Sequence, residues 1–310
     1  MNNASLSYAF NWMNYPREKW PCIIREYLDN GVDSFVFTAP IIRQCLKEPE
    51  LITYLHSLET EYGVRFVAMH GIYGTEDDLD IIDEKRRPSM IEDHIKSLQI
   101  AADFGSKTYT VHPGAYYHVI EQFHVPLTTL RENTLKALDK IIPAAEKCGV
   151  VVAVENAYEP PNSPDEILYY VKHYESSPSI GVCYDTGHAN ILRPFEGREY
   201  AKYECYLPSS WWETGIIYEP NALTKLKPYV VTTHIHDNTG YGDYHSLPYD
   251  GNIEWDKLMP ELTSCPRMLE YQTEICYDWG ENWAGKLPAP KGGYSIRRQV
   301  EVFTKLFSIS

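Results

Sequence analysis

The sequence lacks the features that would place the protein in or across a membrane. It has no apolar run long enough to span a bilayer, and residues 1–14 lack the basic and apolar regions of a secretory signal. It also lacks a CxxC pair, because its seven cysteines are scattered and odd in number. Such cysteines are typical of reduced thiols rather than of a disulfide framework. Together these absences predict a cytoplasmic protein without a membrane segment.

Basic residues are scarce relative to acidic ones. The chain has 28 Lys and Arg residues against 43 Asp and Glu residues, which gives a formal net charge of −15. A surface this acidic repels a phosphate backbone, so nucleic-acid binding is disfavoured. The basic clusters at 85–87 and 297–298 are short, and both are expected to be solvated. Neither is therefore expected to provide a basic binding face.

Several common catalytic motifs are also missing. We find no Gly-x-Ser-x-Gly elbow, phosphate-binding loop or dinucleotide fingerprint in a strand–turn–helix context. Cys183 lies two residues before Asp185 and is expected to share its strand face. We interpret Cys183 as a core residue rather than a nucleophile.

What the chain does contain is a regular alternation of strands and helices. Eight segments rich in Val, Ile, Phe, Tyr or Thr end near Gly, Pro, Asn or Asp, which is typical of strands. They cover residues 6–11, 34–39, 65–70, 107–112, 150–156, 180–185, 230–237 and 268–275. Amphipathic helices are predicted between them, at residues 20–30, 49–62, 90–104, 128–148, 164–174, 253–263 and 296–307.

Four of these helices end at a glycine, at positions 31, 63, 105 and 149, where a helix C-cap would lie. This repeated punctuation indicates βα units in series. Eight such units favour a closed (β/α)8 TIM barrel over a doubly wound sheet, and 310 residues suffice for a barrel of roughly 250. No linker interrupts the pattern, so we expect a single domain over residues 1–310.

Two aromatic-rich insertions follow predicted strands 6 and 8. The first covers residues 193–221 and contains Trp211, and the second covers 277–294 and contains Trp279. Loops at the carboxyl ends of barrel strands cover the active site, so both tryptophans are candidates for substrate contact. They would equally fit a subunit interface, because tryptophan and tyrosine are enriched there too, and a homo-oligomer is one possibility.

Metal-binding side chains stand at the ends of the last four predicted strands. They are Glu155, Asp185, His234 and Glu274. Three carboxylates brought together would repel one another without a cation between them. Carboxylate oxygens with one imidazole nitrogen suit a divalent ion such as Mn, Co, Zn or Mg. We therefore predict a divalent metal site with these four ligands at the carboxyl end of the barrel.

A second group of polar side chains is expected nearby. Its members are His70, His112, His188, Asp243 and His245. They are candidates for binding substrate hydroxyls or phosphate, or for holding further metal ions. His234 and His236 also leave an ambiguity, because residues two apart on a strand share one face and either could be the ligand.

These segments resemble the xylose-isomerase-like barrel superfamily, which holds sugar isomerases and epimerases, inosose dehydratases and endonuclease IV. The resemblance covers residues 6–307. Its most specific pieces are Val154-Glu155-Asn156, Asp185-Thr186-Gly187-His188-Ala189-Asn190, His234-Ile235-His236-Asp237-Asn238, Asp243, His245 and Glu274. In the sugar epimerases, the residues matching Glu155, Asp185, His234 and Glu274 hold one catalytic metal, and the residue matching His188 touches substrate. The resemblance implies His234 rather than His236, because the family's ligand lies three residues before the Asp.

The resemblance to endonuclease IV involves other positions. That family uses additional ligands for a three-zinc cluster, and the matching positions His70, His112, His188, Asp243 and His245 are all filled here. One departure concerns the Pro-Gly-x-Gly stretch usual in the isomerases, which is replaced at residues 248–255.

The resemblance implies a metal-dependent isomerase or epimerase acting on a small sugar or polyol. Glu155 and Glu274 are the candidates for removing and returning a proton next to a metal-bound carbonyl. A related lyase or dehydratase on a keto-sugar or keto-glycoside, and an endonuclease IV-like metal-cluster phosphoesterase, are the enzymatic alternatives. A barrel that binds a sugar or a partner protein without turnover is the non-enzymatic one.

Overall fold

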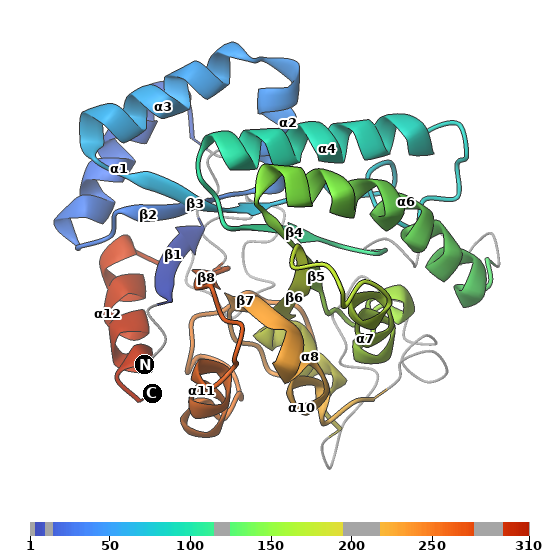
Figure 1. Ribbon diagram of the computed structural model, residues 1–310. Coiled ribbons are helices and arrows are strands. Elements are labelled where there is room, and N and C mark those ends of the chain that lie inside the picture. Colours follow the sequence, from blue (N-terminus) through green and yellow to red (C-terminus); the bar gives the residue numbers. More distant parts are fainter. Residues whose placement is uncertain (1–3, 10–14, 115–124, 195–217, 276–293, 310) are drawn as a thin grey trace.

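Eight parallel strands form a closed barrel in which each strand pairs with its neighbours in chain order (Figure 1). The structure is a computed structural model that describes residues 4–9, 15–114, 125–194, 218–275 and 294–309. The strands are β1 (Ser5–Ala9), β2 (Ser34–Phe37), β3 (Arg65–His70), β4 (Thr108–Val111), β5 (Val151–Glu155), β6 (Ile180–Asp185), β7 (Val230–Ile235) and β8 (Glu270–Thr273). Pairing of β1 with β8 closes the barrel, with Ser5 opposite Glu270. The predicted (β/α)8 barrel and all eight of its strands are confirmed.

The helices pack around the outside of the barrel (Figure 1). They are α1 (Trp20–Asp29), α2 (Ala39–Lys47), α3 (Glu50–Tyr62), α4 (Arg87–Asp103), α6 (Leu127–Cys148), α7 (Pro164–His173), α8 (Thr186–Leu192), α10 (Ala222–Leu226), α11 (Trp255–Thr263) and α12 (Ile296–Phe307). Short 3-10 turns lie at Arg17–Lys19, Pro160–Asn162 and Lys227–Tyr229. The seven predicted helices are confirmed. Three further helices of the described residues, α2, α8 and α10, were not predicted; α8 and α10 have only seven and five residues, too few to show a clear helical period.

The glycine punctuation has its expected conformational basis. Gly63 and Gly149 cap α3 and α6 in the left-handed conformation, with φ of 68° at both positions. Glycine adopts this conformation without the steric penalty of a Cβ atom. The predicted C-caps at 31 and 105 also have positive φ.

The barrel interior follows the two-residue period of the strands. Residues two apart on a strand point to the same side, so Glu270, Gln272 and Glu274 form one inward series along β8. Thr232 and His234 form the matching series on β7. Farther from the carboxyl ends of the strands, the Gln272 amide donates to Thr232 Oγ1 and to Glu270 Oε1, both at 3.0 Å. By the same alternation, His234 and Glu274 continue these two series at the carboxyl end of the barrel.

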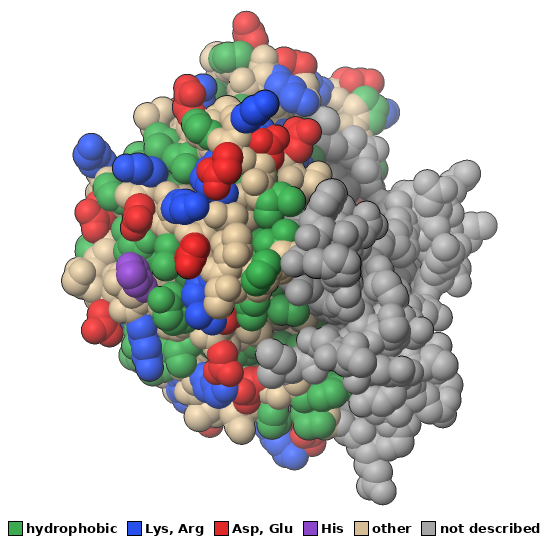
Figure 2. Space-filling model, turned by 90° about the vertical axis from the view of Figure 1, so that its right-hand side faces the viewer, with side chains coloured by type: hydrophobic (Ala, Val, Ile, Leu, Met, Phe, Trp, Pro, Cys, Tyr) green, Lys and Arg blue, Asp and Glu red, His purple; other side chains and the backbone are tan. Residues whose placement is uncertain are grey.

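One expectation about the surface is wrong. Arg87 was expected to be solvated but is buried, with its guanidinium paired with Glu84 and donating to the Ile81 carbonyl. Arg86 pairs with Asp77 and Asp93, so both arginines stabilise the start of α4. The face shown in Figure 2 intersperses acidic and basic side chains among its described residues. Within the described ranges, none of the helices combines the length and the apolarity that a bilayer crossing requires.

Candidate metal centre

Glu155, Asp185, His234 and Glu274 meet at the carboxyl end of the barrel, and we call them the first cluster. One ligand atom from each residue lies within 4.8 Å of the others. They converge because β5, β6, β7 and β8 are successive barrel neighbours, with Asp185 directly opposite His234 in the register. Glu155 and Asp185 end their strands, and Glu274 follows β8 directly.

The centre of the first cluster is His234 Nδ1. It lies 3.1 Å from Glu155 Oε1, 3.1 Å from Glu274 Oε2 and 3.8 Å from Asp185 Oδ2. Despite these short distances, His234 Nδ1 makes no hydrogen bond of acceptable geometry, and neither does Glu274 Oε2. Ligands at 2.0–2.1 Å from a tetrahedral ion lie about 3.4 Å apart. The spacing therefore fits ligands around an ion better than it fits a hydrogen-bonded network.

The electrostatics of the first cluster also favour a cation. Burial would raise the pKa of Glu155, but the imidazoles of His234 and His112 hold it well below its ordinary value. The pKa of Glu274 is likewise lowered despite its burial, mainly by His234. Burial would lower the pKa of His234, yet Cys183 and the carboxylates raise it well above the ordinary value. A proton on the His234 imidazole thus balances the negative charge of the carboxylates, and a divalent ion would balance that charge instead once it binds.

His70 and His112 approach Glu155 from β3 and from the end of β4. Their Nε2 atoms lie 3.8 Å and 3.2 Å from Glu155 Oε2, and 3.3 Å from each other. His70 Nδ1 donates to the Gly71 carbonyl at 2.9 Å, which leaves Nε2 to face the carboxylate. Burial lowers the pKa of His112 to about 4, so this imidazole is neutral and suited to bind metal or a substrate hydroxyl.

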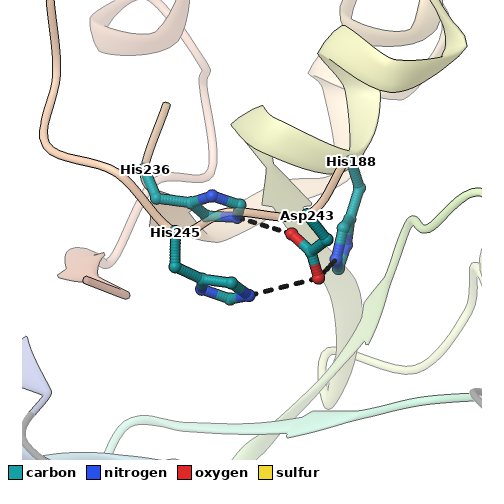
Figure 3. A group of neighbouring side chains, drawn as sticks. All are labelled: His188, His236, Asp243 and His245. Carbon is teal, nitrogen blue, oxygen red and sulfur yellow. Dashed lines mark hydrogen bonds and ion pairs between the residues drawn. The ribbon is translucent and has the colours of Figure 1, made fainter. Parts of the chain in front are cut away.

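A second cluster lies beside the first and consists of His188, His236, Asp243 and His245 (Figure 3). Asp243 is central, because Oδ2 lies 3.3 Å from His188 Nε2 and 3.2 Å from His245 Nε2. Oδ1 lies 3.9 Å from His236 Nε2. Burial opposes a proton on His245, but the Asp243 carboxylate outweighs it and raises the pKa of His245 to about 10.

The described part of the chain brings together every site residue predicted there. His188, Asp243 and His245 form the second cluster with His236, and His70 and His112 adjoin Glu155. His234 Nδ1 faces Glu155 and Glu274 in the first cluster, whereas His236 Nε2 lies 3.0 Å from Asp185 Oδ2 and 3.9 Å from Asp243 Oδ1, between the two clusters. Trp211 and Trp279 lie outside the described residues.

Two further residues position the ligands and were not predicted as site residues. Asn156 hydrogen-bonds both backbone groups of Asp185, and Asp237 anchors the loop that carries Asp243 and His245. In the sequence, both residues stand out only because they lie next to candidate ligands, within the segments that carry the family resemblance. Cys183 is fully buried, as expected of a core residue, although its sulfur lies within 4.8 Å of ligand atoms of Glu155 and His234.

Comparison with known proteins gives a family match over most of the chain. The sequence model of the family described as xylose isomerase-like TIM barrel matches residues 24–285. The uncharacterized protein MJ1311 of Methanocaldococcus jannaschii is 25% identical over 223 residues, which are 69% of this chain and 65% of that protein. The uncharacterized protein y4fM of Sinorhizobium fredii is 29% identical over 154 residues, which are 48% of this chain and 40% of that protein. The match thus spans less than two thirds of either relative.

Solved structures with the same architecture include sugar epimerases. A D-tagatose 3-epimerase-like protein superposes with a TM-score of 0.69 at 17% identity, covering 98% of this chain and 97% of that one. The apo form of the E. coli 3-keto-D-glucoside 4-epimerase YcjR gives a TM-score of 0.67 at 15% identity, covering 98% and 99%. At such identities the likeness establishes the fold.

Proposed function

We propose that this chain, which belongs to the xylose isomerase-like TIM barrel family, is a metal-dependent isomerase or epimerase of a small sugar or polyol. The structural neighbours named as sugar epimerases support a sugar substrate. The first cluster supports a divalent metal such as Mn, Co, Zn or Mg, held by Glu155, Asp185, His234 and Glu274.

The observation that carries the proposal is the placement of two carboxylates around one imidazole. Glu155 from β5 and Glu274 after β8 each approach His234 Nδ1 to 3.1 Å from different strands. The pKa of both carboxyls is lowered, by His234 above all, so both are ionised near neutral pH. Either can take a proton from a substrate held between them, and inversion at a carbon centre then requires a proton to be delivered on the opposite face.

When bound, a divalent ion would act as a Lewis acid that polarises a carbonyl and so makes the neighbouring C–H bond more acidic. Glu274, with a side chain 26% exposed, is the carboxylate open to a substrate, whereas the Glu155 side chain is 1% exposed. We assign Glu274 as one base and Glu155 as the partner that exchanges a proton on the other side. Asp185 and His234 hold the ion.

A carboxylate in this site needs a partner that returns the proton. His112 Nε2 lies 3.2 Å from Glu155 Oε2, and His188 Nδ1 lies 3.4 Å from Glu155 Oε1. Because His188 Nδ1 is also 3.0 Å from the Asn156 carbonyl, it is committed to that bond. His112, whose imidazole is neutral, is therefore the better group to take the proton from Glu155 and pass it on.

Isotope exchange tests the proposal. The purified protein would be loaded in turn with Mn²⁺, Co²⁺, Zn²⁺ and Mg²⁺ and incubated in D₂O with a panel of ketoses and keto-glycosides. We expect deuterium to enter at the carbon next to the carbonyl in the loaded protein and not in the chelated protein. NMR of the products separates isomerisation and epimerisation from elimination, which releases a leaving group. A complete absence of exchange over the panel would overturn the proposal.

A second candidate function is phosphoester hydrolysis by a metal cluster. The observation that favours it is the convergence of His70 and His112 on Glu155 Oε2, next to the second cluster, which gives ligand groups for more than one ion. Neighbouring ions can stabilise both the attacking and the leaving oxygen of a phosphoester. Release of p-nitrophenol from phosphomonoester and phosphodiester substrates, without deuterium exchange in sugars, would favour this function over the first.

A further inference from the structure

The chain from Asn238 to Asn252 forms a loop after β7, and we call it the β7 loop. Its two ends are joined, because the Asn252 amide donates to the Asn238 carbonyl at 2.9 Å. Compact loops whose ends meet in this way frequently carry functional groups. This loop carries Asp243 and His245, and the Asp243 carboxylate also contacts His188 of α8 (Figure 3). The position of the loop therefore decides where these side chains stand.

The β7 loop holds an unfavourable backbone conformation in two places. Within the described ranges, the residues other than glycine with a left-handed backbone are His245, with φ of 46°, and Tyr249, with φ of 75°. A Cβ atom disfavours this conformation, so such residues persist only where the surrounding structure fixes them. Because both residues lie in the β7 loop, the loop depends on contacts that hold it in this shape.

One side chain of α8 is bonded to both ends of the loop. Asn190 is buried, and its Nδ2 donates to Asn252 Oδ1 at 2.7 Å and to Asn238 Oδ1 at 2.9 Å. The Asn238 carbonyl lies 3.2 Å from the same nitrogen. Asn238 Nδ2 in turn donates to the Gly187 carbonyl of α8 at 2.9 Å. The neck of the loop is thus joined to the helix by hydrogen bonds in both directions.

The same helix contacts the loop at a second point and is itself fixed to the first cluster. His188 lies two residues before Asn190, and its Nε2 is 3.3 Å from Asp243 Oδ2. Asp185 stands at the start of α8, where its Oδ1 accepts from the His188 amide at 2.6 Å. The loop is therefore held to α8 at its neck and at Asp243, and α8 is held to a residue of the first cluster.

We propose that Asn190 is a positioning residue that holds the β7 loop so that Asp243 and His245 stand beside His188 and bind substrate there. The inference rests on the proposed sugar reaction and takes these three side chains as the groups that bind substrate hydroxyls. Because the bonds of Asn190 go to the neck of the loop, it acts through the loop and not on the reacting atoms. Loosening the neck should therefore weaken substrate binding and leave the metal ligands in place.

NMR of the histidine rings in the chelated full chain tests this role. The folded state remains the state observed, so a change in global stability alone leaves the ring signals where they are. We expect Asn190→Ala to shift the signals of His188 and His245, because loss of the hydrogen bonds at the neck lets the loop move. His94, which is bonded to the Tyr109 hydroxyl elsewhere in the barrel, should keep its signal.

Kinetics then show whether the loop positions substrate. At saturating metal, Asn190→Ala should raise KM about 10-fold and leave kcat nearly unchanged, since it removes binding that ground state and transition state share. In an Asp243→Ala background the same substitution should have little effect on KM, because a residue that acts through another loses its effect when the other is absent. The affinity of the first cluster for Mn²⁺ should stay that of the wild type.

Matched variants make the result specific. Asn221→Ala alters an exposed residue at the start of α10 whose side chain caps no amide, and it should move neither the signals nor KM. If Asn190→Ala does not fold, Asn252→Ala, at the exposed end of the neck, must shift the same two signals. Unmoved signals of His188 and His245, or a fall in kcat without a rise in KM, would overturn the proposal. Wild-type protein that turns over no sugar would instead refute the proposed function, and the NMR result would still decide whether Asn190 holds the loop.

Discussion

The side chain of Asn156 hydrogen-bonds both backbone groups of Asp185. Its Nδ2 donates to the Asp185 carbonyl at 3.1 Å, and its Oδ1 accepts from the Asp185 amide at 3.0 Å. Because Asn156 follows Glu155 directly, this pair of bonds fixes the end of β5 against the end of β6. The acidic side chains of Glu155 and Asp185, on different strands, are thereby held in a fixed relation without any bond between them.

Replacing Asn156 by Ala should loosen this relation. The two backbone groups of Asp185 would be left buried and unpaired, at a cost of about 2–4 kcal/mol in the free energy of unfolding, measured in urea. The affinity of the first cluster for a divalent ion should fall about 10- to 100-fold in a metal titration, as is usual when a residue that orients a metal ligand is replaced. Asn30→Ala, which removes an exposed bond to Glu26, is the control and should change neither quantity much. A loss of stability with unchanged metal affinity would contradict the positioning role.

The barrel and the first cluster could be predicted because both follow from short-range patterns. Apolar runs ended by Gly, Asn or Asp mark the strands, and the two-residue period assigns residues such as Asp185 and Glu274 to the interior. In a closed barrel of parallel strands, side chains at successive strand ends must then converge.

The second cluster could be predicted only in part. The spacing of His234 and His236 predicts that they share a face, but it cannot show that His236 lies between Asp185 and Asp243 while His234 contacts Glu155 and Glu274. That depends on the room left by Gly187 and on the loop path after Asp237, which are set by contacts far apart in the sequence. The bonds of Asn156 are hidden from the sequence for the same reason.

Glu274→Gln should reduce deuterium exchange into the substrate. Glutamine keeps the size of the side chain but cannot accept the proton, so exchange should fall about 10²- to 10⁴-fold at saturating metal, followed by NMR. Bound metal must be measured in parallel, because the variant also loses a ligand charge. Glu261→Gln, on the surface of α11, serves as the control. Full exchange in a metal-loaded Glu274→Gln protein would refute its assigned role.

Gly187→Ala should be destabilising although alanine is the better helix former. Its Cβ would collide with the His236 ring at 2.0 Å, and overpacking of this kind costs about 1–3 kcal/mol. In a His236→Ala background the collision disappears, and the same substitution should stabilise α8 by up to about 1 kcal/mol. A double-mutant cycle on unfolding free energies checks this coupling. Equal effects of Gly187→Ala in both backgrounds would show that the ring does not depend on the glycine.

Glu270 should make stability fall as pH rises. Burial raises the pKa of this carboxyl from 4.5 to about 7, and hydrogen bonds from Thr108 and Gln272 only partly offset that effect. Between pH 4.5 and 7 the folded state binds more protons than the unfolded state. As pH rises through this range, the free energy of unfolding of wild type should therefore fall by about 3 kcal/mol relative to that of Glu270→Gln. Above pH 7 the difference should be constant. Chemical unfolding at several pH values measures it, with exposed Glu175→Gln as the control. A difference that does not vary with pH would show that Glu270 is ionised throughout.

Asp237 organises the loop after β7 through four hydrogen bonds. Its carboxylate accepts from the amides of Asn238 at 2.8 Å, Tyr249 at 3.0 Å and Ile253 at 3.2 Å. It also accepts from the Trp255 indole at 2.8 Å. This carboxylate thus anchors residues 248–255.

Asp237→Asn should therefore disturb the second cluster from a distance. Each carboxylate oxygen accepts from two N–H donors, and in asparagine one of these oxygens becomes an NH₂ group, which cannot accept. Two hydrogen bonds are therefore lost and the NH₂ group points at the two donors, at a cost of about 3 kcal/mol or more in the free energy of unfolding. Trp255→Phe removes only the indole donor and should cost less, about 1–2 kcal/mol. Because the loop carries Asp243 and His245, the pKa of His245, which Asp243 raises to about 10, should fall toward its ordinary value in metal-free Asp237→Asn and stay high in Trp255→Phe, as measured by NMR of the imidazole. An unaltered pKa of His245 in a destabilised Asp237→Asn protein would show that these two residues keep their positions without the anchor.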